Sequence, residues 1–247
     1  MARSFLILHG YAGSGPEHWQ TWLADRLRRA GEHVAYPELP SPFAPRLEAW
    51  REALEAELRA LPGDPVVVCH SLACILWLHH AAAAVREGGR AERVLLVAPP
   101  SARAGFRPIL PCFPVPVDRG RVTAAATGET RVVCSVDPYC PEGAEVLYGE
   151  PLGLPVDRLP HGAHINPESG YGPWPAAEAW CYAGGSLGRP VLVERPEDPR
   201  SSEERDDDDP NAIGYRNADE EAPYDERGSQ GTGPAEPPAE EEPEPAA

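Results

Sequence analysis

The sequence of 247 residues contains no lysine, so its basic side chains are 22 arginines. It also lacks any run of about 18 or more apolar residues, the length at which a segment becomes a candidate membrane-spanning helix. A surface for nucleic acid or for anionic lipids needs a cluster of basic side chains, and the sequence has none. These absences argue against a nucleic-acid partner and against a membrane partner.

The 39 acidic residues give a net charge of −17, and they gather near the end of the chain. Residues 190–247 have a net charge of −14, whereas the first 189 residues have a net charge of −3. The acidic segment is rich in proline, glycine and serine, and it has too few apolar residues to offset the entropy lost on ordering. We therefore expect a folded domain over residues 1–188 and a disordered acidic tail over residues 189–247. The tail is a candidate contact for a basic partner.

Six cysteines lie at positions 69, 74, 112, 134, 140 and 181, and none forms a Cys-x-x-Cys pair. No group of histidines and cysteines has the spacing of zinc ligands. The first apolar stretch, Phe5–Leu8, is too short for the core of a signal peptide. We therefore expect a cytoplasmic protein without a metal site. Its cysteines are expected to be small buried apolar side chains rather than disulfides.

Short apolar runs alternate with segments whose apolar residues recur at helical spacing. The runs predict strands over residues 5–8, 33–36, 66–68, 93–98, 131–135 and 154–159. The helical spacing predicts helices over residues 17–27, 47–61, 72–85 and 175–182, and residues 99–130 are interpreted as a long connection or partial cover. Strands that alternate with helices form a parallel sheet covered on both faces. The expected fold class is α/β, with a doubly wound, mostly parallel sheet of about six strands.

Ser71 stands between a buried strand and the apolar helix that begins at Leu72. At such a turn the hydroxyl is held out of the fold, and the N–H groups of the helix start lie beside it. Small residues are needed two positions to either side, and these positions hold Cys69 and Ala73. Two interpretations stay open, a nucleophilic serine and an ordinary helix N-cap.

Gly10, Asp137 and His164 also follow predicted strands. Because ligands bind at the carboxyl ends of parallel strands, we expect these residues at the same edge of the sheet as Ser71. Asp137 precedes a proline, as turn aspartates do. His164 lies in a loop rich in glycine and proline, where a surface histidine is the simpler interpretation and His161 is a competitor.

Four other positions complete the candidate site or compete with it. The backbone N–H groups of Tyr11 and Leu72 are the expected oxyanion hole. Asp157 and Glu142 are the alternatives to Asp137 as the acid. His79 and His80 are adjacent on a helix, so their side chains point to different faces, and we interpret both as structural.

A resemblance to a known family is carried by five stretches: His9–Gln20, His70–Leu72, Phe113–Pro116, Asp137–Pro141 and Gly162–Trp174. They resemble the small α/β-hydrolase family typified by retinoblastoma-binding protein 9, above all its bacterial members, over residues 3–184. The resemblance implies a compact serine hydrolase with a minimal lid and no cofactor. It also implies that Ser71 is the nucleophile, Asp137 the acid and His164 the base.

The expected activity is hydrolysis of a small ester, thioester or amide through an acyl-enzyme on a Ser-His-Asp triad. A carboxylic-ester hydrolase acting on a small acyl substrate is the first expectation. The alternative is a non-catalytic interaction protein on an α/β-hydrolase scaffold, with the acidic tail as its binding element.

Overall fold

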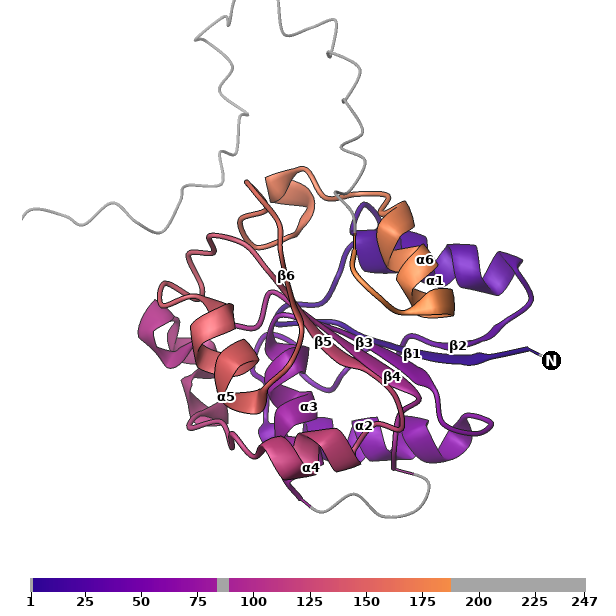
Figure 1. Ribbon diagram of the computed structural model, residues 1–247, viewed down its shortest axis with the longest axis horizontal. Coiled ribbons are helices and arrows are strands. Elements are labelled where there is room, and N and C mark those ends of the chain that lie inside the picture. Colours follow the sequence, from indigo (N-terminus) through magenta and orange to yellow (C-terminus); the bar gives the residue numbers. More distant parts are fainter. Residues whose placement is uncertain (1, 84–88, 188–247) are drawn as a thin grey trace, which may run out of the picture. The chain divides into compact units, whose positions relative to one another are not determined.

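The computed structural model describes residues 2–83 and 89–187, which Figure 1 draws as coloured ribbon. One sheet of six strands runs through it, and every pair of neighbouring strands is parallel. The strands are β1 (Ser4–Leu8), β2 (His33–Ala35), β3 (Val66–His70), β4 (Arg93–Val97), β5 (Thr130–Cys134) and β6 (Val156–Arg158). Their order in the sheet is β2-β1-β3-β4-β5-β6, which confirms the predicted parallel sheet.

Helices cover both faces of this sheet, so the doubly wound arrangement is confirmed (Figure 1). The helices α1 (Trp19–Arg29) and α6 (Pro175–Ala183) lie on one face. The other face carries α2 (Leu47–Ala60), α3 (Leu72–Ala82), α4 (Arg119–Ala124) and the single turn α5 (Glu150–Leu152). Four short turns complete the described elements: η1 (Ala102–Ala104), η2 (Arg107–Cys112), η3 (Glu145–Gly149) and η4 (Pro167–Ser169).

Two hydrophobic cores fill the space between the sheet and the helices. Alternate residues of a strand point to opposite faces, so Phe5 and Ile7 join the core that contains α1 and α6. Leu6 and Leu8 join the core that contains α2 and α3. The central strands β3 and β4 are buried along their whole length, because helices cover both of their faces. This packing holds the carboxyl ends of the strands, where the functional loops begin, in fixed positions.

The structure corrects several predicted boundaries. The helix after Ser71 ends at Ala82 rather than running to residue 85, and residues 84–88 lie outside the described part. The first helix begins at Trp19 because the His18 side chain caps it, with Nδ1 accepting from the backbone N–H of Gln20. The connection over residues 99–130 contains η1, η2 and α4, whose prolines and glycines obscure any helical spacing.

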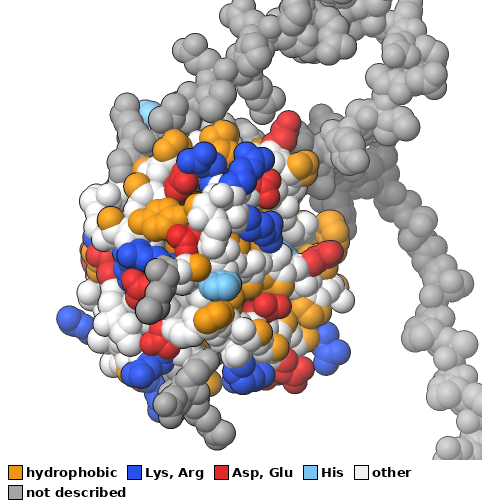
Figure 2. All heavy atoms as spheres, turned by 90° about the vertical axis from the view of Figure 1, so that its right-hand side faces the viewer, with side chains coloured by type: hydrophobic (Ala, Val, Ile, Leu, Met, Phe, Trp, Pro, Cys, Tyr) orange, Lys and Arg blue, Asp and Glu red, His pale blue; other side chains and the backbone are white. Residues whose placement is uncertain are grey.

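The remaining sequence predictions concern the surface and the cysteines. All six cysteines are buried and unpaired, as expected of small apolar side chains. No helix within the described ranges is long and apolar enough to cross a membrane. On the face shown in Figure 2, arginine and acidic side chains are interspersed rather than gathered by sign. The acidic tail over residues 189–247 lies outside the described residues and stays a prediction.

Candidate active site

Ser71 lies on a sharp turn between β3 and α3. Its backbone has φ 53° and ψ −122°, a combination that an L-residue adopts only under constraint from its surroundings. That constraint includes the bond from the Ser71 N–H to the Val97 carbonyl, 2.9 Å long. The Ser71 side chain does not cap the helix, so the N-cap interpretation does not describe it. Its hydroxyl is instead free to contact groups at the carboxyl edge of the sheet.

The turn forms because its neighbours leave it room. A Cβ atom added to Gly10 would lie 2.7 Å from the Ser71 Cβ, so only glycine fits at the end of β1. Cys69 and Ala73 are fully buried in the core on the α2 and α3 side. The bulk of the Cys69 side chain is therefore accommodated inside the fold, and the turn around Ser71 is retained.

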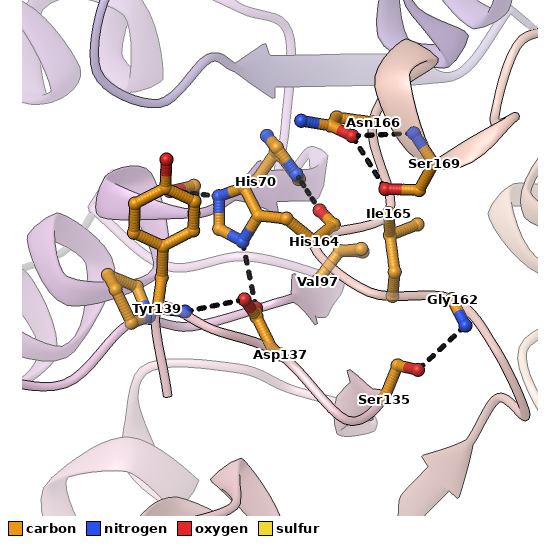
Figure 3. A network of polar contacts seen from close by, with 12 residues as sticks. His70, Val97, Ser135, Asp137, Tyr139, Gly162, His164, Ile165, Asn166 and Ser169 are labelled. Carbon is orange, nitrogen blue, oxygen red and sulfur yellow. Dashed lines mark hydrogen bonds and ion pairs between the residues drawn. The ribbon is translucent and has the colours of Figure 1, made fainter. Parts of the chain in front are cut away.

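Three side chains from separate loops meet at this edge. The His164 Nε2 lies 2.9 Å from the Ser71 Oγ. The His164 Nδ1 lies 2.8 Å from the Asp137 Oδ2 (Figure 3). The Asp137 and His164 side chains are only 3% and 12% exposed, so water screens their contact weakly. The structure thus brings together the three residues that the sequence suggested, in one continuous hydrogen-bonded chain.

Asp137 is held in place by its own turn. Its Oδ1 accepts from the Tyr139 N–H at 2.8 Å, and its carbonyl accepts from the Cys140 N–H at 3.0 Å. The aspartate is therefore a turn residue, as its sequence context indicated, and it also contacts His164. The two alternative carboxylates are engaged elsewhere. Glu142 accepts from Ser101 and pairs with Arg103, whereas Asp157 pairs with Arg131 and accepts from the Leu187 N–H.

The loop that carries His164 contains three non-glycine residues with positive φ: His161, Ala163 and Ile165. Such backbone costs on the order of 1–3 kcal/mol per residue and persists only where the surroundings impose it. Of the two candidate histidines, His161 is exposed and His164 faces the serine.

Three side chains from other elements hold this loop. The Gly162 N–H donates to the Ser135 Oγ at 2.7 Å, and Trp19 Nε1 donates to the Ile165 carbonyl at 2.9 Å. His70 Nε2 lies 2.9 Å from the His164 carbonyl, which accepts its proton (Figure 3). Sequence reasoning missed these three anchors. Only His70, directly before the serine, stood where the sequence could have drawn attention to it.

The buried histidines around the site are neutral at pH 7. Burial lowers the pKa of His18 to about 3 and holds the pKa of His70 well below its ordinary value. Burial also lowers the pKa of His9, whose Nδ1 donates to the Gly10 carbonyl at 2.7 Å while Nε2 accepts from the Leu39 N–H. Each ring therefore offers one donor and one acceptor with fixed roles.

Two backbone N–H groups near Ser71 have no acceptor among the described residues. One belongs to Leu72, the first residue of α3, and the other belongs to Tyr11, the residue after Gly10. The His9 bond to the Gly10 carbonyl orients the peptide group that carries the Tyr11 N–H. An anionic oxygen in front of Ser71 would be the acceptor that suits these two donors.

A pocket of about 390 Å³ opens in front of Ser71 and His164. The Gly10–Gly15 loop, His18 and His70 form part of its wall, and Pro100, Phe106, Ile109 and Tyr139 form another part. The volume is at the lower end of the roughly 300–1,000 Å³ that small-molecule pockets span. Across residues 2–83 and 89–187, no group of three or more His, Cys, Asp or Glu side chains is arranged to hold a metal ion.

The chain is similar to proteins that are named as hydrolases. YdeN of Bacillus subtilis, named as a hydrolase, is 25% identical over 181 residues, which is 69% of this chain and 90% of YdeN. The crystal structure of the ydeN gene product has a TM-score of 0.63 at 22% identity and covers 72% of this chain and 96% of its own. A YdeN-like hydrolase from Pectobacterium atrosepticum has a TM-score of 0.54 at 20% identity, covering 72% of this chain and 89% of its own.

The fold shared with these structures is that of α/β-hydrolases, as the sequence predicted. The narrower resemblance to the branch typified by retinoblastoma-binding protein 9 is tested by none of these relatives and stays a prediction. A family model described as Serine hydrolase matches residues 5–182, a span that includes Ser71, Asp137 and His164. With the fold, the relatives and that match in agreement, the chain belongs to the serine hydrolase family.

Proposed function

We propose that this protein hydrolyses a small ester, thioester or amide through an acyl-enzyme, with Ser71 as nucleophile, His164 as base and Asp137 as acid. The observation that carries the proposal is the 2.9 Å contact between the Ser71 Oγ and the His164 Nε2. A serine hydroxyl is a weak nucleophile at neutral pH unless an adjacent base takes its proton. A carboxylic ester is the first substrate to test.

The acylation step follows from the contacts of His164. The Nδ1–H group donates a hydrogen bond to Asp137, so Nε2 carries no proton and is the acceptor that faces Ser71. As the Ser71 oxygen bonds to the substrate carbonyl carbon, its proton passes to Nε2. His164 then gives this proton to the departing alcohol, thiol or amine. Asp137 stays ionised and stabilises the imidazolium between the two transfers.

Deacylation repeats these transfers with water in place of the alcohol. His164 takes a proton from the water as its oxygen attacks the acyl carbon, and it returns the proton to the Ser71 oxygen as the carboxylic acid leaves. In both steps the carbonyl oxygen becomes an anion, which the N–H groups of Tyr11 and Leu72 stabilise. One such donor contributes roughly 10²–10³ in rate in related sites.

A fluorophosphonate probe tests the proposal directly, because it reacts only with an activated serine. We expect the serine oxygen to displace fluoride from the probe, so that the wild-type protein gains the mass of one probe less HF. We also expect it to hydrolyse p-nitrophenyl butanoate. Ser71→Ala is expected to abolish both, with residual hydrolysis lower by several orders of magnitude. Ser186→Ala is the matched control, since the Ser186 hydroxyl is exposed and donates to Asp157 away from the pocket.

Two results would overturn the proposal. A wild-type protein that neither labels nor hydrolyses any ester would favour the non-catalytic interaction protein. A folded Ser71→Ala protein with wild-type labelling would move the nucleophile to another residue. Circular dichroism of both variants shows whether the fold persists, so that loss of activity is assigned to the missing hydroxyl.

A further inference from the structure

Three aromatic side chains stand together on one side of the pocket. Tyr11 and Phe106 meet edge to face with ring centroids 4.9 Å apart, and Phe106 meets Tyr139 in the same way at 6.0 Å. All three line the pocket in front of Ser71. We call Tyr11, Phe106 and Tyr139 the aromatic wall.

The aromatic wall borders His164, the proposed base. The Tyr139 ring lies 4.5 Å from the His164 ring, centroid to centroid, with the planes inclined at 55° (Figure 3). A substrate group against this wall is therefore next to the atoms that react.

The wall is built from three separate loops, which follow β1, β4 and β5. None of its rings is fully buried, and Tyr139 is 38% exposed. Aromatic surface that stays in contact with water is a source of binding free energy when a ligand covers it. Rings also prefer edge-to-face or offset contacts with other rings, which a flat group in the pocket can add.

The charged side chains that line the pocket also favour an uncharged substrate group. No arginine is among the described residues that line it, and the sequence has no lysine. The one ionisable carboxyl group in the lining belongs to Glu168. An anionic substrate group would therefore meet the Glu168 carboxylate and no arginine or lysine in this lining.

We propose that the aromatic wall is the subsite for an uncharged aromatic ring of the substrate. This inference rests on the proposed hydrolase activity and specifies its substrate class. The preferred substrate is a neutral ester, thioester or amide that carries a flat ring on its acyl or leaving-group side.

Two pairs of esters test the preference on each side of the reacting carbonyl. Benzyl butanoate and cyclohexylmethyl butanoate have the same carbon skeleton with a flat or a puckered ring in the alcohol, and methyl phenylacetate and methyl cyclohexylacetate have the same difference in the acid. Each ratio is divided by the ratio of the two hydroxide-catalysed rates, which removes the difference in intrinsic reactivity. Acid release is followed by pH-stat. In at least one pair we expect kcat/KM to be about three- to tenfold higher for the aromatic member, the range that specific ring contacts supply.

Variants then assign the preference to the wall. Phe106→Leu keeps an apolar side chain of similar size but removes the flat ring, so the ratio between the paired esters is expected to fall to about one. The matched control is Phe43→Ala. Phe43 is 68% exposed and contacts Tyr11 from outside the wall, so its removal is expected to leave the ratio unchanged. A third ester, 4-carboxybenzyl butanoate, is expected to react about tenfold more slowly than benzyl butanoate, or slower still.

The outcomes separate the subsite from the activity on which it rests. Failure of the wild-type protein to label with fluorophosphonate overturns the proposed function itself. If the protein labels but prefers neither aromatic ester, or hydrolyses neither pair, the subsite is wrong. The subsite is also wrong if Phe106→Leu keeps the wild-type ratio or if the carboxylated ester reacts as fast as the neutral one.

Discussion

His70 is expected to be a positioning residue for the proposed base, and replacing it by phenylalanine tests this role. Its Nε2 donates to the His164 carbonyl at 2.9 Å, and its ring lies 5.0 Å from the His164 ring. Burial holds the pKa of His70 well below its ordinary value, so the ring is a neutral donor throughout the working pH range. Phenylalanine keeps the ring and its packing but removes the donor.

The structure sets the size of the effect. Removing the donor leaves a carbonyl of the loop without this partner, which costs about 1–3 kcal/mol where the site is buried. The loop also contains three non-glycine residues with positive φ, and it relaxes when a constraint is lost. A displacement of about 1 Å at a reacting group lowers rate by roughly 10²-fold. We therefore expect His70→Phe to lower kcat by about 10- to 100-fold, with a smaller change in KM.

The assay is steady-state hydrolysis of p-nitrophenyl butanoate together with the rate of fluorophosphonate labelling. His70→Gln is the conservative rescue, since the glutamine side-chain N–H can reach the position of Nε2 and is expected to restore most of kcat. If His70 had only a structural role, His70→Phe would lower the melting temperature but would not lower kcat more than it changes KM.

His79→Phe is the matched control. It removes the same kind of bond from a histidine on α3, the helix that follows Ser71. The His79 Nε2 donates to the Cys112 carbonyl at 2.9 Å, away from the pocket. This variant is expected to lose stability without losing rate. The reasoning is refuted if His70→Phe hydrolyses the ester at the wild-type rate, or if His79→Phe loses as much kcat as His70→Phe.

The other predictions concern the triad and the response to acid. His164→Ala should lose as much rate as Ser71→Ala, because the two act as one unit, while alanine at the exposed His161 should have a mild effect. Asp137→Asn should still place the serine but lower kcat by several orders of magnitude, and a nearly silent Asp137→Asn would point to another acid. Burial lowers the pKa of His18 from 6.5 to about 3, so the unfolded chain takes up the proton first as pH falls. The His18 contribution to the free energy of unfolding is thus complete above pH 6.5 and has dropped by about 3 kcal/mol at about pH 4. His18→Asn keeps an acceptor for the Gln20 N–H but does not titrate, so it should flatten this slope in urea unfolding, and an unchanged slope would contradict the assignment.

The sheet could be predicted from the sequence because buried parallel strands leave an unambiguous pattern. Runs such as Val66–Val68 are apolar at every position, since both faces of a central strand are covered. The segment between β4 and β5 could not be predicted in the same way. Its short turns contain Pro108, Pro111 and Gly120, and they depend on contacts with the sheet rather than on local periodicity.

Ser71, Asp137 and His164 were identified because the topology of a parallel sheet brings strand ends to one edge, whatever the separation along the chain. Their anchors were not, and the reason is also physical. Trp19 reaches the Ile165 carbonyl over a separation of 146 residues, and nothing local in the Trp19 sequence distinguishes that contact from ordinary packing of an amphipathic helix. The Ser135 Oγ accepts from the Gly162 N–H across 27 residues of sequence, and nothing in the sequence next to Ser135 indicates that bond.

The aromatic wall could not be predicted from the sequence, because it depends on how three loops are arranged in space. Tyr11 and Tyr139 each lie beside a residue that the sequence singled out, yet Phe106 lies in the connection that the sequence left without structure. Only when η2 packs near the end of β1 does Phe106 meet both tyrosines. The placement of the proposed reacting groups therefore follows from the way parallel strand ends meet at one edge, whereas the shape of the pocket depends on one irregular segment. Variation in that segment between related chains is expected to change which substrates fit, while the hydrogen-bonded chain from Ser71 to Asp137 stays the same.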